Sequence, residues 1–156
     1  MSREFLSYWK PDGLSFLQYT QWKARYLGSD QLARRGIDPG DRVWISTMRG
    51  ELFNMIAPLV VREIVGPQRA RELIGIAEVY QSKWYAIAVD PQTVRQFSIE
   101  ELVDQLRFVG ANDRLTRTNG RVDAKQLQTI RELTVDSANL LETAWQLRLA
   151  GPNTRV

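Results

Sequence analysis

The sequence predicts an α+β domain built around a curved, mixed sheet with helices packed outside it. Segments with strand and helix patterns are interleaved along the chain, without the strict strand–helix–strand alternation of a parallel α/β sheet. The longest apolar segment, residues 52–64, has Pro58 near its middle, and proline inside a strand marks an edge or a bulge. Bulges bend strands, as a small closed or half-closed barrel requires.

The first predicted element is a strand over residues 3–10, where the side chains alternate between two faces, and turn residues at 11–13 end it. Residues 14–28 repeat apolar positions at helical spacing, which predicts a helix that Gly28 ends. Residues 29–36 predict a second, short helix. The apolar face of the first helix is expected to carry Phe16, Tyr19, Trp22 and Tyr26.

A hairpin is predicted next, with strands over residues 42–48 and 52–64 and a turn near Gly50. One face of the first strand would carry Val43, Ile45 and Thr47, and the other Arg42, Trp44, Ser46 and Met48. Trp44 thus shares its face with polar side chains. Two interpretations stay open: Trp44 packs in the core, or it receives a flat ligand.

The rest of the chain is predicted to hold one more strand and several helices. Pro67 is typical of a first helical residue and Gly75 of a helix end, while residues 83–89 alternate like a strand. Further helix starts are indicated by the pairs Ser98 with Glu101 and Asp123 with Gln126, and by Thr134. The core positions of the last helix would be Ala138, Leu141, Trp145 and Leu149.

The composition is that of one globular domain. The chain has 156 residues, of which 44% are hydrophobic and 25% charged, enough to bury a sizeable core. We expect a single domain over residues 1–150 and a frayed tail over residues 151–156. No apolar run reaches the length of a membrane span, and the N-terminus lacks the apolar core of a signal peptide. These features predict a cytoplasmic protein that does not partner a membrane.

Cysteine and histidine are both absent. Their absence excludes disulfides, thiolate chemistry and a Ser-His-Asp triad, and it removes the commonest metal ligands. The paired carboxylates Glu100 and Glu101 fall on a predicted helix face, where they fit solvated surface charge. We therefore expect a protein that is not an enzyme and that needs no cofactor and no metal.

The basic residues favour nucleic acid as a partner. The net charge is +3, the pI is about 9.4, and most of the 21 Lys and Arg residues are arginine. Arginine makes forked contacts to phosphate and stacks on flat rings. A GC-rich genome would give the same preference for arginine, so the composition leaves both explanations open.

The candidate site residues follow from the needs of a base pocket, which are flat rings, polar groups at the base edge and cations for phosphates. Trp44 is the predicted stacking platform, supported by Trp9 or Tyr85; Trp9 and Trp84 can instead close the core. The predicted base-edge contacts are Ser46, Thr47 and Asp12, and the predicted phosphate contacts are Arg42, Arg49 and Lys10. Solvated surface is the interpretation for Arg34, Arg35, Arg114 and Arg117.

Several motifs, taken in order, resemble a group of small bacterial proteins. They are YWKP, PGDRVWI with GELF and VVREI, QLRF, and GRVDAKQLQTIRELTVDSANLLE. The group is the EVE and YTH branch of the PUA-like superfamily, and the resemblance runs from about Phe5 to Trp145. It implies a five- or six-stranded PUA-like pseudo-barrel with helices outside, and relatives that take a modified base into an aromatic pocket. EVE-like domains of this kind occur fused to restriction enzymes that act on modified DNA.

The sequence thus predicts a non-catalytic module that flips a modified base, modified cytosine in DNA, into an aromatic pocket, with DNA favoured over RNA. Any effector is expected to be a separate protein. The segment WKARYLGSDQLARRG replaces a polar, His-Ala-rich segment of the group, which leaves the ligand open. The alternatives are an RNA-binding module and an interaction domain for a peptide or small ligand.

Overall fold

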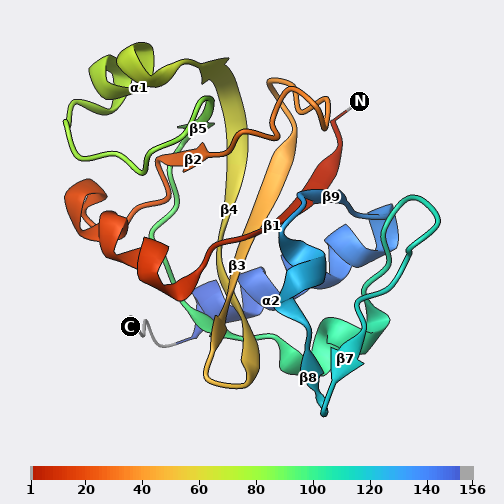
Figure 1. Cartoon of the computed structure of the whole chain (residues 1–156). Helices are drawn as coiled ribbons and strands as arrows, with labels where there is room; N and C mark the ends of the chain where they lie inside the picture. Colours follow the sequence, from red (N-terminus) through yellow and green to blue (C-terminus); the bar gives the residue numbers. More distant parts are fainter. Residues whose placement is uncertain (1, 152–156) are drawn as a thin grey trace.

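The computed structural model describes residues 2–151, so all of the predicted tail except Gly151 lies outside the described residues. The fold is α+β, as predicted, and its centre is a mixed sheet with the strand order β2-β5-β4-β3-β1-β9, plus β6 beside β4 (Figure 1). Strands β1 and β3 are parallel, and the other neighbouring pairs are antiparallel. The sheet is open and does not close into a barrel.

The strands of this sheet are β1 (Glu4–Tyr8), β2 (Tyr26–Gly28), β3 (Arg42–Arg49), β4 (Leu52–Val65), β5 (Tyr85–Val89), β6 (Phe97–Ser98) and β9 (Arg131–Glu132). A separate small hairpin consists of β7 (Arg117–Thr118) and β8 (Arg121–Val122). The α-helices are α1 (Pro67–Ile74) and α2 (Val135–Ala150), and the 3-10 helices are η1 (Pro11–Thr20), η2 (Glu100–Gln105) and η3 (Ala124–Leu127). In Figure 1, α2 crosses behind the lower half of the sheet, and α1 lies at its upper left.

The bend predicted in the long strand is confirmed. The register between β3 and β4 shifts between Ile45 and Ser46, which leaves Ile56 as the extra residue of a bulge. Pro58 lies two residues further on, between the part of β4 that pairs with β6 and the part that pairs with β5. Proline lacks an amide hydrogen, so it fits this position, where β4 changes partner.

Both predicted helix ends around α1 and the start of α2 are confirmed. Pro67 is the first residue of α1, and Gly75 ends it with a left-handed φ of 79°. Thr134 caps α2, since its side chain accepts a hydrogen bond from the amide of Ser137 at 3.3 Å. The core is continuous from the sheet into α2; its largest fully buried side chains include Phe5, Trp44, Phe53 and Ile56, and Trp145 of α2 belongs to the same cluster.

The helix predicted over residues 14–28 is wrong. η1 ends at Thr20, because Gln21 and Trp22 both adopt left-handed backbone, with φ of 57° and 60°. Residues 26–28 instead form β2, which pairs with β5. The aromatic residues at helical spacing therefore belong to different elements, some to η1 and some to β2.

The short helix predicted over residues 29–36 is a turn. Ser29 Oγ accepts a hydrogen bond from the Gln31 amide at 3.1 Å, and Gly36 adopts a left-handed φ of 65°. Residues 2–151 contain no helix that is both long and apolar enough to cross a membrane.

Candidate functional site

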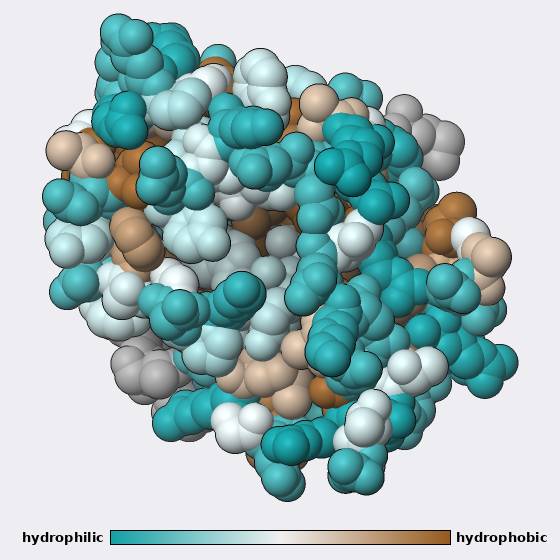
Figure 2. All heavy atoms as spheres, in the orientation of Figure 1, coloured by the Kyte–Doolittle hydropathy of each residue, from teal (hydrophilic) through white to brown (hydrophobic). Residues whose placement is uncertain are grey.

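An open cleft lies near the centre of the face shown in Figure 2, with hydrophobic atoms at its floor. Its volume is about 460 Å³, a size typical of sites for small ligands. Its walls come from the end of β1, from η1, from β2 and from η3. We call it the aromatic cleft, because its lining includes Tyr8, Trp9, Phe16, Tyr26 and Tyr80.

Trp9 follows the last residue of β1 and is anchored to β3. Its amide donates to the carbonyl of Ser46 at 2.8 Å, and its carbonyl accepts from Oγ1 of Thr47 at 2.7 Å. The first bond continues the pairing of β1 with β3 beyond the end of the strand, and the second adds a side-chain anchor. The partly exposed indole ring is thereby held at the wall of the cleft.

Tyr80 is presented to the cleft by the loop between α1 and β5, and 45% of it is exposed. Two buried tyrosine hydroxyls hold this loop. The Tyr26 hydroxyl accepts from the Tyr80 amide at 2.8 Å, while the Tyr85 hydroxyl donates to the Tyr80 carbonyl at 2.6 Å and accepts from the Ser82 amide at 2.9 Å. The Tyr80 ring meets the ring of Phe16 edge-on, with centroids 5.6 Å apart. The aromatic wall is thus fixed from behind by the sheet.

A second anchor joins the same loop to the turn that follows β2. Asp30 Oδ1 accepts from the amide of Lys83 at 2.8 Å and from Oγ of Ser82 at 3.1 Å. The hydrogen bond from the Lys83 amide is the main reason that the pKa of Asp30 lies below its usual value, and the Ser82 hydroxyl adds to it. The carboxylate form of Asp30 therefore stabilises the loop that carries Tyr80.

The cleft is uncharged inside and cationic at its border. Burial raises the pKa values of Tyr8 and Tyr26, so both phenols stay neutral near pH 7. Lys10 and Lys125 are exposed lining residues on opposite walls, one before η1 and the other in η3. This arrangement can stack a planar ring against aromatic side chains and hold an anionic group at the opening.

Two of the predicted site residues, Trp9 and Lys10, line the cleft. Tyr85 lies behind the cleft, only 1% exposed, and its hydroxyl positions the loop of Tyr80 instead of contacting a ligand. Asp12 is exposed on η1, next to the lining residue Gly13, without lining the cleft itself.

Trp44, the predicted stacking platform, is completely buried. β3 is a central strand covered on both faces, so the alternation of its side chains does not separate core from solvent. Nε1 of Trp44 donates to Oε1 of Glu4 at 3.2 Å, and the Arg42 guanidinium lies 4.6 Å from the centre of the ring. A base cannot reach either face of this indole, so Trp44 is a core residue.

The other predicted contacts on β3 are also engaged within the protein or lie elsewhere. Ser46 and Thr47 are fully buried, and their hydroxyls donate to the Ser7 and Trp9 carbonyls at 2.8 and 2.7 Å. Arg42 forms ion pairs with Glu4 of β1 and Glu142 of α2, which occupy its guanidinium. Arg49 is exposed at the β3–β4 turn and does not line the cleft.

The cleft also contains four residues that the sequence did not indicate as site residues: Phe16, Tyr26, Tyr80 and Lys125. Phe16 and Tyr26 were placed on the core face of one helix, and Tyr80 falls in a segment without a periodic pattern. One signal was present: EVYQSKWY contains three aromatic residues among polar ones, which suits an exposed loop with a function.

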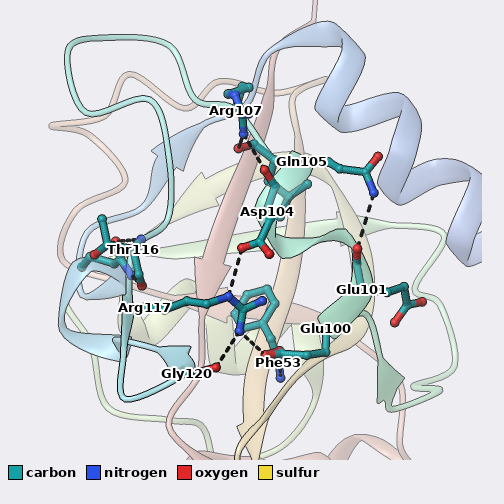
Figure 3. A network of polar contacts seen from close by, with 11 residues as sticks. Phe53, Glu100, Glu101, Asp104, Gln105, Arg107, Thr116, Arg117 and Gly120 are labelled. Carbon is teal, nitrogen blue, oxygen red and sulfur yellow. Dashed lines mark hydrogen bonds and ion pairs between the residues drawn. The ribbon is translucent and has the colours of Figure 1, made fainter.

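Arg117 is not solvated surface but the centre of a polar network (Figure 3). Nη1 donates to Oε1 of Glu100 at 2.7 Å and to the Gly120 carbonyl at 3.0 Å, and Nε donates to Oδ1 of Asp104 at 3.0 Å. The bonds to Glu100 and then to Asp104 raise the pKa of Arg117. Glu100 also accepts from the amide of Phe53 at 3.0 Å, so the network connects the β7–β8 hairpin with β4.

Among residues 2–151, no group of three or more carboxylates is placed to hold a metal ion. The comparisons with protein-family models and with curated proteins give no match to this chain.

Proposed function

We propose that this chain is a nucleic-acid-binding module that takes one base into the aromatic cleft. The observation that carries the proposal is the cleft itself. Trp9, Phe16 and Tyr80 come from three separate segments and surround one opening, and Lys10 and Lys125 border it. A flipped base needs flat rings to stack on and cations for the adjacent phosphates.

The resemblance found in the sequence adds a second line of support. Two of its motifs, YWKP and GRVDAKQLQTI, contribute lining residues from opposite walls of the cleft, namely Trp9 and Lys10 from the first and Lys125, Leu127, Gln128 and Ile130 from the second. We therefore propose a PUA-like fold of the EVE and YTH type, with Trp9 and Tyr80 taking the place of Trp44 as stacking surfaces.

The proposed ligand is DNA that carries a modified cytosine, which is the class that the resemblance implies. The proposed role is non-catalytic, with an effector on another protein. Release of a base or nucleotide from modified DNA by the purified chain alone would contradict that role.

Fluorescence anisotropy tests the proposal with DNA duplexes that carry cytosine, methylcytosine or hydroxymethylcytosine at one position, and with RNA of the same sequence. Stacking contributes about 1–3 kcal/mol per base, so we expect Tyr80→Ala or Trp9→Ala to raise the Kd for the preferred duplex about 5- to 150-fold. Trp84→Ala is the matched control, because this aromatic residue is 43% exposed and does not line the cleft.

Equal binding of all duplexes, with no effect of Tyr80→Ala, would contradict the proposal. A preference for RNA over DNA would support the cleft as a base-binding site but identify its ligand as RNA. Binding that barely changes with salt would instead point to a peptide or an uncharged small ligand.

A further inference from the structure

A second hollow, larger and more polar, lies beside the aromatic cleft. Its volume is about 860 Å³, and it runs between the turn after β2, the loop before β7 and the segment that joins η3 to β9. We call it the arginine groove, because its charged lining residues are Arg34, Arg35, Arg114, Arg131, Asp113 and Glu132.

The groove has an excess of positive charge, because its lining contains four arginines and two carboxylates, and each carboxylate already lies near an arginine. Asp113 lies 3.9 Å from Nε of Arg114, and Glu132 lies 3.6 Å from Nη1 of Arg3, outside the groove lining. Arg34 and Arg35 are exposed, and neither forms an ion pair with another residue in the range 2–151. The sequence suggested solvated surface for both, but in the structure both line the concave arginine groove.

Arg131 is the most buried of the four arginines. Its guanidinium lies 4.1 Å from the centre of the Phe108 ring and donates to the carbonyl of Asn112. Burial lowers the pKa of Arg131, and the carboxylate of Asp113 only partly offsets this. The cation is therefore partly desolvated and forms no ion pair among the described residues, a state that a bound anion would stabilise.

The groove and the cleft are separated by one narrow ridge. Ile130 lines both hollows, and the turn after β2 contributes Ser29 to the cleft and Arg34 and Arg35 to the groove. Gln31 holds this turn to the ridge: its Oε1 accepts from the Ile130 amide at 2.8 Å, and its Nε2 donates to the Gln128 carbonyl at 2.6 Å. The two hollows therefore adjoin at Ile130 and at the turn after β2.

We propose that the arginine groove binds the backbone phosphates of the same strand whose base occupies the aromatic cleft. This inference rests on the proposed function. Forked guanidinium groups suit phosphate oxygens, and a groove that contacts only phosphates adds affinity without adding base preference. The cleft selects the base, and the groove fixes the path of the strand on one side of it.

The test compares Arg34→Gln with Arg35→Gln, made together, against Arg62→Gln with Arg69→Gln. The control pair removes the same charge from arginines that are 59% and 55% exposed outside the groove. Binding of labelled single-stranded DNA is measured from about 50 to 200 mM salt. Loss of two phosphate contacts should make the slope of log K against log salt less steep by about 1.4. The ratio of the Kd values for modified and unmodified strands should stay unchanged.

A second measurement asks whether one strand occupies both sites. Strands that carry the modified base are lengthened stepwise on the 5′ or the 3′ side. We expect lengthening on only one side to increase affinity, and the groove variant to abolish that increase. An unchanged salt slope, or an equal gain from both sides in the groove variant, would overturn the inference.

The two proposals fail in different ways. If Tyr80→Ala leaves base preference intact while the groove variant flattens the salt slope, the phosphate site stands and base binding in the cleft is overturned. If Tyr80→Ala removes the preference and the groove variant behaves as its control, base binding stands and the groove is overturned. Wild-type protein that shows no salt-dependent binding overturns both.

Discussion

At the scale of single residues, the hydroxyl of Thr47 is one of two groups on β3 that anchor the backbone of Trp9. Thr47→Val keeps the shape of this buried side chain but removes the donor to the Trp9 carbonyl. We expect the free energy of unfolding to fall by about 1–2 kcal/mol and binding at the cleft to weaken. Urea unfolding followed by tryptophan fluorescence measures the first effect. Thr118→Val, at an exposed residue of β7, is the control, and equal midpoints for the two variants would contradict the prediction.

The burial of Trp44 and Trp84 is the reverse of the roles that the sequence suggested, which were ligand contact for Trp44 and core packing for Trp84. Trp44 is completely buried, so Trp44→Ala should reduce the free energy of unfolding by about 3–5 kcal/mol, or prevent folding. Trp84 is 43% exposed, and Trp84→Ala should change it by about 0.5 kcal/mol or less. Trp44→Phe, which loses only the bond to Glu4 and part of the ring, serves if the alanine variant does not fold. Similar unfolding midpoints for the two alanine variants would refute this assignment.

Residue types could be predicted as site candidates, but their burial could not. Trp9 was identified as a flat ring on a predicted strand, and Lys10 as a cation near it that could contact phosphates. Trp44 was misassigned because alternation separates two faces and does not tell whether both are covered. Whether both faces of β3 are covered depends on the order of the strands in the sheet, which cannot be read from the local pattern of a single sequence.

At the scale of elements, the loop between α1 and β5 depends on tyrosine hydroxyls. Tyr85→Phe removes the donor to the Tyr80 carbonyl and the acceptor for the Ser82 amide, while the ring stays in the core. We expect the free energy of unfolding to fall by about 1–2 kcal/mol, with faster amide exchange in this loop than elsewhere. Tyr19→Phe, at an exposed tyrosine, is the control. Unchanged exchange in the loop would show that the hydroxyl does not hold it.

The same loop should respond to acid through Asp30. Its pKa is lower in the folded protein than usual, so the carboxylate stabilises the fold above its ordinary pKa. This contribution should disappear as the pH falls through the folded-state pKa. The difference in unfolding free energy between wild type and Asp30→Asn should therefore be largest near neutral pH and shrink between about pH 5 and pH 2. Urea unfolding across that range measures it; a difference that grows in acid would have the wrong sign.

Element prediction succeeded where one local pattern corresponds to one element. The ends of α1 follow from Pro67 and Gly75, and the bend of β4 follows from Pro58. It failed over residues 14–28, where aromatic residues at helical spacing belong partly to η1 and partly to β2. Tertiary pairing of β2 with β5 outweighs local periodicity there, and nothing within the segment signals that pairing.

At the scale of the whole molecule, the α+β class and the bent central hairpin could be predicted, whereas the open sheet and the candidate site could not. The cleft takes Trp9, Tyr26, Tyr80 and Lys125 from four distant segments, which only the strand order brings together. The net charge of +3 likewise does not tell which arginines are paired within the fold and which are exposed. Arg42 and Arg117 are paired within the fold, while Arg34 and Arg35 stand in a concave surface.

Arg42 connects three elements of the fold and so provides a test of its cooperativity. From β3 it donates to Glu4 of β1 at 2.6 Å and to Glu142 of α2 at 3.1 Å, and it covers the ring of Trp44. Burial alone would lower the pKa of Arg42, but its bonds to the two glutamates raise it overall. Arg42→Gln should therefore reduce the free energy of unfolding by about 1–3 kcal/mol, since it leaves partly buried carboxylates without their cation.

Arg117→Gln is the matched comparison, because Arg117 also bonds two carboxylates but joins the β7–β8 hairpin to η2 and, through Glu100, to the start of β4, without reaching β1 or α2. Amide exchange should rise across β1, β3 and α2 in Arg42→Gln, and only around η2, β7, β8 and the Phe53 amide in Arg117→Gln. Equal and local effects in both variants would mean that α2 is held to the sheet by apolar packing alone. In that case the stacking of Trp145 on Phe97, with ring centroids 6.2 Å apart, would be the contact to change next.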